Sequence, residues 1–293
     1  MFVLLIFHNT FAKESRMVFV MEFFDGYTLL DHDLVEKGDV NSSIPSGLGD
    51  FMGKTHAATH KSIVSDDQAK YLTSHFENRP MRDIQLEWVF TKAYKETTEE
   101  QRLGLDMDED FMAEIEALKS SYDGKTESLS LCHGDLHPGS VMVNNDGDVK
   151  VIDPEFTVYG PPGLDVGSVL SGYVLAAVHQ AYSKNQRAVE SICEGMDILW
   201  KAYREAMIAG GISLEDLQKV ESDSVGFTLA EVCRTALEFA GDRKWLQFDD
   251  SEVKVKSKKA ALTIVRNCMT KRHEDGIQLL LAETRKISIV GTI

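Results

Sequence analysis

The sequence lacks any apolar run long enough to form a membrane helix. Such a helix needs about 18 consecutive apolar residues, and the longest candidate, 166–182, includes Ser168, Ser171, His179 and Gln180. This pattern is typical of a buried helix in a globular core. The apolar residues 1–7 lack the charged region and the small-residue cleavage site of a secretory signal. We therefore expect neither secretion nor a membrane partner.

Paired cysteines are absent as well. The four cysteines stand far apart, with no CxxC pair and no spacing typical of a metal centre: Cys132, Cys193, Cys233 and Cys268. Scattered cysteines of this kind indicate reduced residues of a protein core. The sequence therefore predicts a cytoplasmic protein.

Positive charge is scarce. The chain has 31 lysines and arginines against 47 aspartates and glutamates, which gives a net charge of −16. No basic block appears, and the overall field would repel a polyanion. We therefore expect no nucleic-acid partner.

What the chain does have is a mostly helical pattern. Its 293 residues, 43% of them hydrophobic, are enough for one or two domains with a full core. Apolar residues repeat at helical spacing around 48–56 and 111–118, and more weakly over 83–94. A second helical region covers 164–286, with breaks near 210–211 and 241–242. An apolar run over 16–24 predicts a strand covered on both faces, ended by a turn at Asp25-Gly26.

The centre of the chain has a different pattern. A short apolar segment, 128–132, leads into the polar loop HGDLHPGS at 133–140. Two β-type runs, 141–143 and 149–152, then enclose the turn 144–147. Such a pattern indicates a β-hairpin. The predicted fold class is therefore α+β, mostly helical, with a small hairpin in the middle.

Carboxylates flank this hairpin on both sides. Asp135 precedes it, where it could accept a hydrogen bond from a substrate hydroxyl group. Asp153 and Glu155 follow it, and Pro154 between them favours an extended chain at Asp153. Residues two apart in an extended chain point to the same face, so both carboxylates could hold one Mg²⁺ ion. Positioning, charge neutralisation and a group that orients a hydroxyl are what phosphoryl transfer requires.

The order HGDLHPGS…VIDPE resembles the aminoglycoside phosphotransferase and choline kinase superfamily. This resemblance implies a protein-kinase-like fold, ATP and Mg²⁺ as cofactors, and Asp135 as the catalytic residue. It also implies that Asp153 is a magnesium ligand. Ser140 stands where the superfamily usually has a metal-binding asparagine.

A narrower resemblance is to the 5-methylthioribose kinases of methionine salvage. VIDPEF at 151–156 and YGPPGLDVG at 159–167 closely follow that family's pattern, and the serine at 140 matches it too. VMEFF at 20–24 resembles the family's hinge, which implies that the backbone of Met21, Glu22 and Phe23 binds adenine. The implied phosphoryl acceptor is the 1-hydroxyl of a small sugar.

His133 in the loop and Asp165 after it also have structural interpretations. His133 and His137 are four apart, but Pro138 and Gly139 indicate a loop and not a zinc-binding helix. His133 is therefore interpreted as a residue that holds the loop. Asp165 is either the N-cap of a helix beginning at 166 or, by the resemblance, an anchor for the backbone of the catalytic loop.

The chain departs from the family at its beginning. Kinases of this superfamily start with a β-rich lobe that carries a nucleotide-covering loop and a strand lysine. Here about twenty residues precede the hinge, and Lys13 is their sole lysine. We therefore interpret 1–25 as a remnant of that lobe with the hinge, and 26–293 as the kinase-like C-terminal lobe. The isolated chain is expected to fold but to turn over ATP slowly or not at all.

A second departure concerns the acceptor. The family's adjacent arginines, which contact the sugar, fall on Leu246 and Gln247, and only a shifted alignment reaches Arg243. Two alternatives therefore stay open besides a methylthioribose-type kinase. One is another aminoglycoside- or choline-type small-molecule kinase, and the other is a kinase-like protein without catalysis. A homodimer is left open too.

Overall fold

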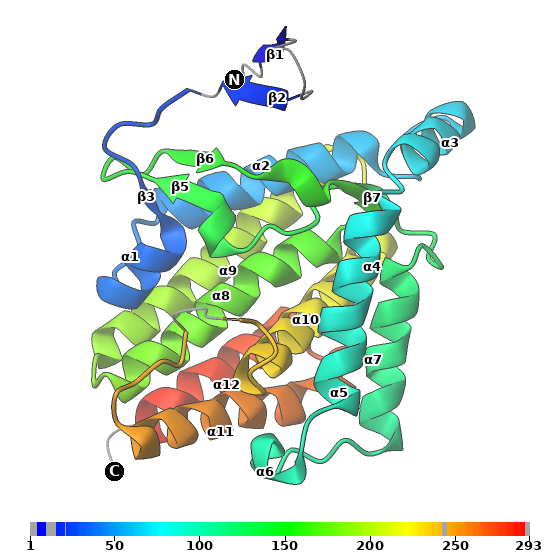
Figure 1. Cartoon of the computed structure of the whole chain (residues 1–293). Coiled ribbons are helices and arrows are strands. Elements are labelled where there is room, and N and C mark those ends of the chain that lie inside the picture. The colour runs from blue at the N-terminus through cyan, green and yellow to red at the C-terminus, as the bar shows by residue number, and fades with distance from the viewer. Residues whose placement is uncertain (1–4, 10–15, 21, 242–244, 291–293) are drawn as a thin grey trace.

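The structure is a computed structural model that describes residues 5–9, 16–20, 22–241 and 245–290. Within these residues, helices form most of the chain and short antiparallel strands form three small sheets. Figure 1 shows the helices packed into one body, with the hairpin of β5 and β6 beside α2 at one end. The mostly helical α+β class is thereby confirmed, whereas the division at residue 25 stays a prediction.

The first half of the chain contributes short helices. They are α1 (Leu30–Glu36), α2 (Ser43–Thr59), α3 (Asp66–His75), α4 (Arg79–Glu87), the π-helix η1 (Trp88–Lys92), α5 (Ala93–Lys95), α6 (Glu99–Arg102) and α7 (Glu109–Tyr122). Side chains cap several of them; Asp108 accepts the backbone N–H of Phe111 at the start of α7. The expected apolar face of α7 is buried, since Ile115 and Leu118 are inaccessible to solvent.

The weakly predicted helix over 83–94 is present as α4, η1 and α5 in succession. The π-helical turn inserts one extra residue into the helical register. The hydroxyl group of Thr91 donates to the carbonyl oxygen of Leu86, five residues earlier, at 2.8 Å. This turn brings Val89 and Phe90 to the inside of the molecule, where both side chains are buried.

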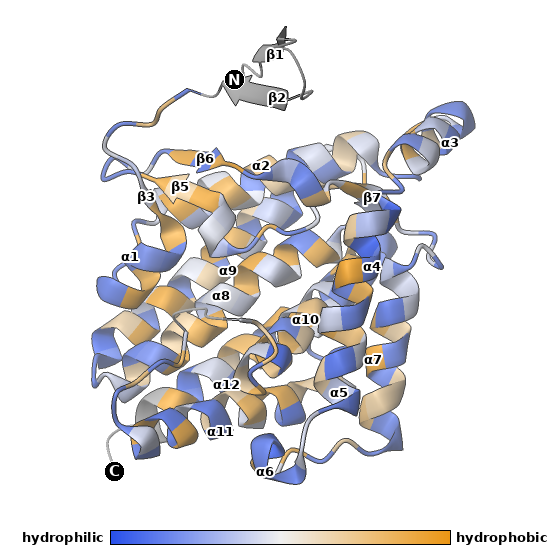
Figure 2. Ribbon diagram, in the orientation of Figure 1, coloured by the Kyte–Doolittle hydropathy of each residue, from blue (hydrophilic) through white to orange (hydrophobic). Residues whose placement is uncertain are grey.

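The second half of the chain forms long helices. They are α8 (Gly163–Tyr182), α9 (Gln186–Ala209), α10 (Leu214–Ala236), α11 (Ser251–Cys268) and α12 (Gly276–Val290). Every residue of α8 except His179 and Tyr182 is buried, because α9, α10, α11 and α12 pack around it. Figure 2 shows this apolar centre and the hydrophilic outer faces. No helix among the described residues could span a membrane.

Three sheets complete the fold. Strands β1 (Leu5–Asn9) and β2 (Arg16–Val20) pair with each other, and β3 (Thr28–Leu29), β5 (Val141–Val143) and β6 (Val149–Val151) form the second sheet. The third joins β4 (Ser130–Cys132) to β7 (Val158–Gly160). The hairpin predicted at 141–152 is thus confirmed, and the strand predicted at 16–24 forms over its first five residues.

This topology brings two loops together. One loop, 133–140, leaves β4 and enters β5, and the other, 152–157, leaves β6 and enters β7. Because β4 pairs with β7 and β5 pairs with β6, both loops are held between the same two pairs of strands. Below, 133–140 is called the catalytic loop and 152–157 the DPE loop.

Helices α2 and α9 cross closely because glycine lines their contact. A Cβ atom added at Gly49 would lie 2.3 Å from the carbonyl oxygen of Leu199, whereas one added at Gly47 would lie 3.8 Å from its nearest neighbour, in Val149. The crossing therefore depends on Gly49 having no side chain.

We expect Gly49→Ala to lower the free energy of unfolding by about 1–3 kcal/mol, the usual cost of overpacking. Gly47→Ala on the same helix is the matched control, and its higher helix propensity should leave stability unchanged or slightly raised. Urea unfolding followed by circular dichroism measures both. Equal stability of the two variants would contradict the close crossing.

Candidate active site

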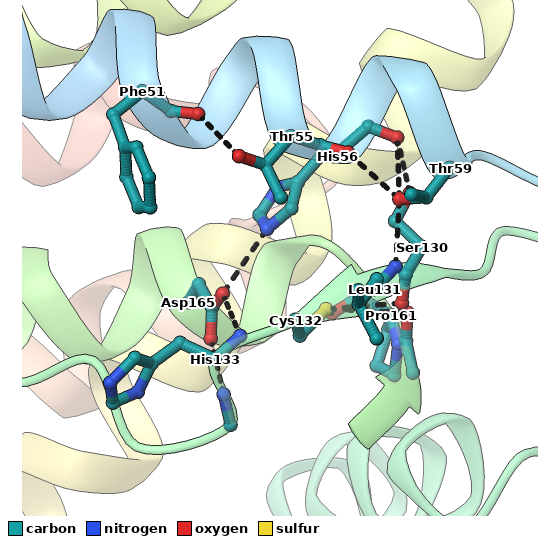
Figure 3. Close-up of polar contacts among 12 residues, drawn as sticks. Phe51, Thr55, His56, Thr59, Ser130, Leu131, Cys132, His133, Pro161 and Asp165 are labelled. Atoms are coloured by element: carbon teal, nitrogen blue, oxygen red, sulfur yellow. Dashed lines mark hydrogen bonds and ion pairs between the residues drawn. The ribbon is translucent and has the colours of Figure 1, made fainter. Parts of the chain in front are cut away.

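The catalytic loop is fastened to the core by Asp165. The carboxylate of Asp165 accepts the backbone N–H of His133 at 2.7 Å and that of Gly134 at 2.9 Å. It also lies 3.1 Å from Nε2 of His56, on α2 (Figure 3). This is the anchoring contact that the resemblance implies. The N-cap interpretation is wrong, because α8 begins two residues earlier and Asp165 lies inside its first turn.

The charge on Asp165 is retained although the side chain is buried. Burial alone would raise the pKa of its carboxyl group, but the hydrogen bonds from His56 and from the backbone N–H of Gly134 lower that pKa overall. The carboxylate is therefore ionised at neutral pH and can accept several donors at once.

His133 holds the catalytic loop to the DPE loop. Its Nδ1 accepts the backbone N–H of Asp135 at 3.3 Å, so its Nε2 carries the proton and donates to the carbonyl oxygen of Ile152 at 2.8 Å. This agrees with its interpretation as a structural residue. His137 lies in the loop as well, where its Nδ1 accepts the N–H of Gly139 at 2.9 Å.

Asp135 is half-buried at the mouth of a pocket. Its carboxylate lies 3.7 Å from Nε2 of His137. Its own carbonyl oxygen accepts the hydroxyl group of Ser140 at 3.1 Å, which closes the loop. Ser140 is buried and braces Asp135 in this way; its role as a metal ligand stays a prediction.

The DPE loop differs from the prediction. Asp153 is in the left-handed region, with φ 63° and ψ 57°, and Pro154–Phe156 form the 3₁₀ turn η3. The expected extended chain, with both carboxylates on one strand face, is therefore wrong. Pro154 disfavours the right-handed helix at Asp153, and aspartate is among the residues that adopt the left-handed region most readily. Asp153, Pro154 and Glu155 are all exposed on this turn, where carboxylate oxygens suit Mg²⁺.

The predicted hinge is described in part. Met21 lies outside the described residues, and Glu22 and Phe23 are exposed, the latter at 86%. The chain then runs beside the hairpin: the hydroxyl group of Tyr27 donates to Asp148 at 2.5 Å, and β3 pairs with β5. The hinge segment thus leads directly to the hairpin that carries the two loops. Its contact with adenine stays a prediction.

The predicted acceptor residue Arg243 lies outside the described residues. Another arginine, Arg234 on α10, pairs with Glu231 at 2.8 Å, and Glu231 lines the same pocket as Asp135. Both side chains are nearly buried, at 11% and 13% exposure. No sequence motif predicted this pair. The sequence does contain a sign of it: Glu231 and Arg234 are opposite charges within the largely apolar segment 225–236. Charged side chains are buried mainly when they are paired, so a buried ion pair could have been predicted there.

The pocket has a polar side and an apolar side. Gln85, Asp135 and Glu231 supply polar groups, and apolar walls come from Val89, Phe90, Leu164 and Phe227. The π-helical turn presents Val89 and Phe90 to it, and α10 presents Phe227 and Glu231. The cavity itself has a volume of about 10 Å³, roughly the room that one water molecule needs, so an acceptor would have to widen it.

One further group has the residue types of a metal site. Ligand atoms of His56, Cys132 and Asp165 all lie within 4.8 Å of one another, and all three residues are buried. Their protein partners already engage them: Asp165 holds the catalytic loop, and the second ring nitrogen of His56 bonds to Tyr203 at 3.1 Å. Burial raises the pKa of the Cys132 thiol well above its usual value, which keeps it protonated. We therefore interpret the group as a structural anchor.

Comparison with known proteins places the chain in a family. The family model of the phosphotransferase enzyme family matches residues 11–203. This match covers the hairpin, both loops and α8, so the chain belongs to that family.

Curated relatives narrow the resemblance. A methylthioribose kinase of Geobacillus kaustophilus is 29% identical over 295 residues, which cover 94% of this chain and 74% of the relative. Those of Geobacillus thermodenitrificans and Escherichia coli O45:K1 are 28% and 26% identical, and in each case 71% of the relative is covered.

Solved structures were compared as well. An ethanolamine kinase of Plasmodium vivax is similar with a TM-score of 0.47 and 14% identity, covering 92% of this chain and 70% of that one. A choline/ethanolamine kinase family protein of Mesorhizobium loti has a TM-score of 0.45 and 14% identity. The match covers 97% of this chain and 79% of that protein.

We expect Asp165→Asn to lower the free energy of unfolding at pH 7 by about 2 kcal/mol or more, because a buried charge-assisted network is broken. The folded pKa of Asp165 is lowered, so its contribution is full above the unfolded pKa, about 3.9, and is lost as pH falls through the folded pKa. The difference between variant and parent should therefore shrink at acidic pH.

Urea unfolding at pH 7 and at several acidic pH values tests this expectation. Asp50→Asn, which removes a partly exposed carboxylate paired with Lys54 on α2, is the control and should cost little. A difference that stays constant across this pH range would argue against an ionised Asp165.

Proposed function

We propose that this protein is an ATP-dependent kinase of a small sugar, most like S-methyl-5-thioribose kinase of methionine salvage. It would transfer the γ-phosphoryl group of Mg²⁺-ATP to the 1-hydroxyl of the sugar, in the cytoplasm. The observation that carries this proposal is the anchored catalytic loop, which holds Asp135 at a pocket beside the DPE loop. Family membership supports the phosphotransferase class, and the relatives support the acceptor.

Each loop would have its own task. Asp135 would accept the proton of the attacking hydroxyl group. Asp153 and Glu155 would hold the Mg²⁺ that neutralises charge developing on the phosphates. The backbone of Met21–Phe23 would hold adenine beside the hairpin.

The residue types of the pocket lining favour an acceptor that is polar at one end and apolar at the other, and such an acceptor would have to widen the pocket. Sugar hydroxyl groups would face Asp135 and Glu231, and a methylthio group would pack against Phe90 and Phe227. In this proposal Arg234, and not Arg243, is the arginine on the acceptor side, and it acts through Glu231, with which it pairs at 2.8 Å.

A second candidate acceptor is a cationic one, as in aminoglycoside- or choline-type kinases. The carboxylate of Glu231 at the pocket favours it, since a carboxylate binds ammonium groups. Arg234 neutralises that carboxylate at 2.8 Å, which favours the neutral sugar. A third candidate is a kinase-like protein without catalysis. It predicts that the chain binds nucleotide or acceptor but releases no ADP.

Phosphorylation assays on the full chain distinguish these acceptors. ADP release in the presence of Mg²⁺-ATP gives kcat/KM for each acceptor. We expect kcat/KM for methylthioribose to exceed that for choline or kanamycin by at least about tenfold, which corresponds to about 1.4 kcal/mol. Calorimetric titration with each acceptor gives a second measurement that needs no turnover. Preference for a cationic acceptor in both assays would replace the sugar kinase by the second candidate.

Asp135→Ala should lower kcat by about 10²–10⁴-fold, because the general base is lost. The affinity for nucleotide should change little, since Asp135 lies on the acceptor side. Steady-state kinetics and nucleotide titration measure the two effects separately. A variant that retained a tenth of the activity would remove Asp135 from the catalytic role.

Asp153→Asn and Glu155→Gln should both raise the concentration of Mg²⁺ needed for half-maximal rate, and Asp153→Asn should lose most of the rate. Glu127→Gln is a suitable control, because Glu127 is exposed at 92% of its side chain and pairs only with Lys61 among the ion pairs described. Unchanged magnesium dependence in both variants would place the metal elsewhere.

A further inference from the structure

Helix α4 contacts both active-site loops through side-chain amides. We propose that Asn78 and Gln85 are positioning residues that fix the distance between Asp135 and the metal-binding DPE loop. This inference rests on the proposed function of those loops. Nothing in the sequence resemblance involves either residue.

Asn78 holds the DPE loop. Its Nδ2 donates to the carbonyl oxygen of Glu155 at 2.9 Å and to that of Thr157 at 3.0 Å. Both amide hydrogens are therefore used on one loop. Asn78 precedes α4 with φ 42°, a left-handed conformation that asparagine tolerates better than most residues. Because its backbone carbonyl is held, Glu155 can direct its carboxylate to a metal ion.

Gln85 holds the catalytic loop. Its Nε2 donates to the carbonyl oxygen of Gly134 at 2.8 Å, and the N–H of the same residue donates to Asp165. Both backbone polar groups of Gly134, its N–H and its carbonyl oxygen, are thus held directly before Asp135. The two loops also touch here, because a Cβ atom added at Gly134 would lie 2.0 Å from the carbonyl oxygen of Phe156.

Asn78 immediately precedes the first residue of α4, and Gln85 lies in its last turn. Seven residues of helical rise, about 10 Å, therefore separate the two positions. The helix is itself fixed: Arg79 pairs with Asp123 at 2.8 Å, and buried Arg82 donates to the carbonyl oxygen of Tyr159 at 3.1 Å. A fixed helix with one amide on each loop sets the separation of the loops.

This separation matters for phosphoryl transfer. The catalytic carboxylate and the metal must hold the attacking hydroxyl group and the γ-phosphate in line, and small misplacements cost large factors in rate. Residues that orient metal ligands typically contribute 10- to 100-fold to metal affinity or activity. The two amides act on different loops, so their loss should affect different measured quantities.

The test uses the full chain with Mn²⁺ and ADP as probes, followed by electron paramagnetic resonance, alongside kinetics with methylthioribose. Asn78→Gly keeps a residue that tolerates positive φ and removes both donors. Gln85→Met keeps the side-chain length and removes the donor. Asn145→Gly and Gln278→Met are matched controls at exposed positions. Thermal unfolding reports whether each variant folds, and Asn78→Asp and Gln85→Glu replace any variant that does not.

We expect Asn78→Gly to weaken Mn²⁺ binding about 10- to 100-fold, with the rate recovered in part at high Mg²⁺. Gln85→Met should leave Mn²⁺ affinity unchanged, lower kcat about tenfold at saturating Mg²⁺, and speed hydrogen exchange in 133–137. The controls should match the parent in every measurement.

Unchanged Mn²⁺ affinity in a folded Asn78→Gly variant would overturn the role of Asn78. Parent-like kcat and exchange in Gln85→Met would overturn that of Gln85. Equal losses of stability, metal affinity and rate in both variants would show that α4 is merely structural. If the parent neither phosphorylates nor binds any of the acceptors, the proposed function fails, whereas Mn²⁺ binding and hydrogen exchange still decide this inference.

Discussion

The shape of the catalytic loop depends on one buried carboxylate, that of Asp165 in the first turn of α8. A buried charge is costly unless several donors meet it, and here two backbone N–H groups and the ring of His56 do so. The same contacts satisfy N–H groups of a loop that could not otherwise bend tightly at Gly134. Because α8 is buried along nearly its whole length, these contacts tie the loop before Asp135 directly to the core.

Much of this arrangement could be predicted from the sequence, and the reasons are local. Two short apolar runs around an Asn/Asp/Gly turn predict the hairpin at 141–152. The apolar composition of 166–182 predicts the buried helix α8. The conformation of Asp153 could not be predicted, because proline excludes one backbone region and tertiary contacts choose between the others. Asn78 and Gln85 gave no signal either, since their partners are carbonyl groups that any sequence supplies.

The pair of Glu231 and Arg234 shows a different limit. The family pattern predicts adjacent arginines beyond residue 241, whereas Glu231 lines the pocket of Asp135 from α10 and pairs with Arg234 on the same helix. Side chains three apart on a helix lie on one face, so spacing in sequence could have suggested the pair. Its place at the pocket required the packing of α10 against α8.

The π-helical turn Trp88–Lys92 has a consequence for how such a pocket can diversify. Each residue of a helix turns the chain by about 100°, and this turn contains one residue more than an α-helical turn would. Deleting that residue would restore the α-helical register and rotate Val89 and Phe90 relative to the pocket that they line, without changing Asp135. Insertion and deletion of single residues at this turn thus offer evolution a route to new pocket linings that point substitutions do not.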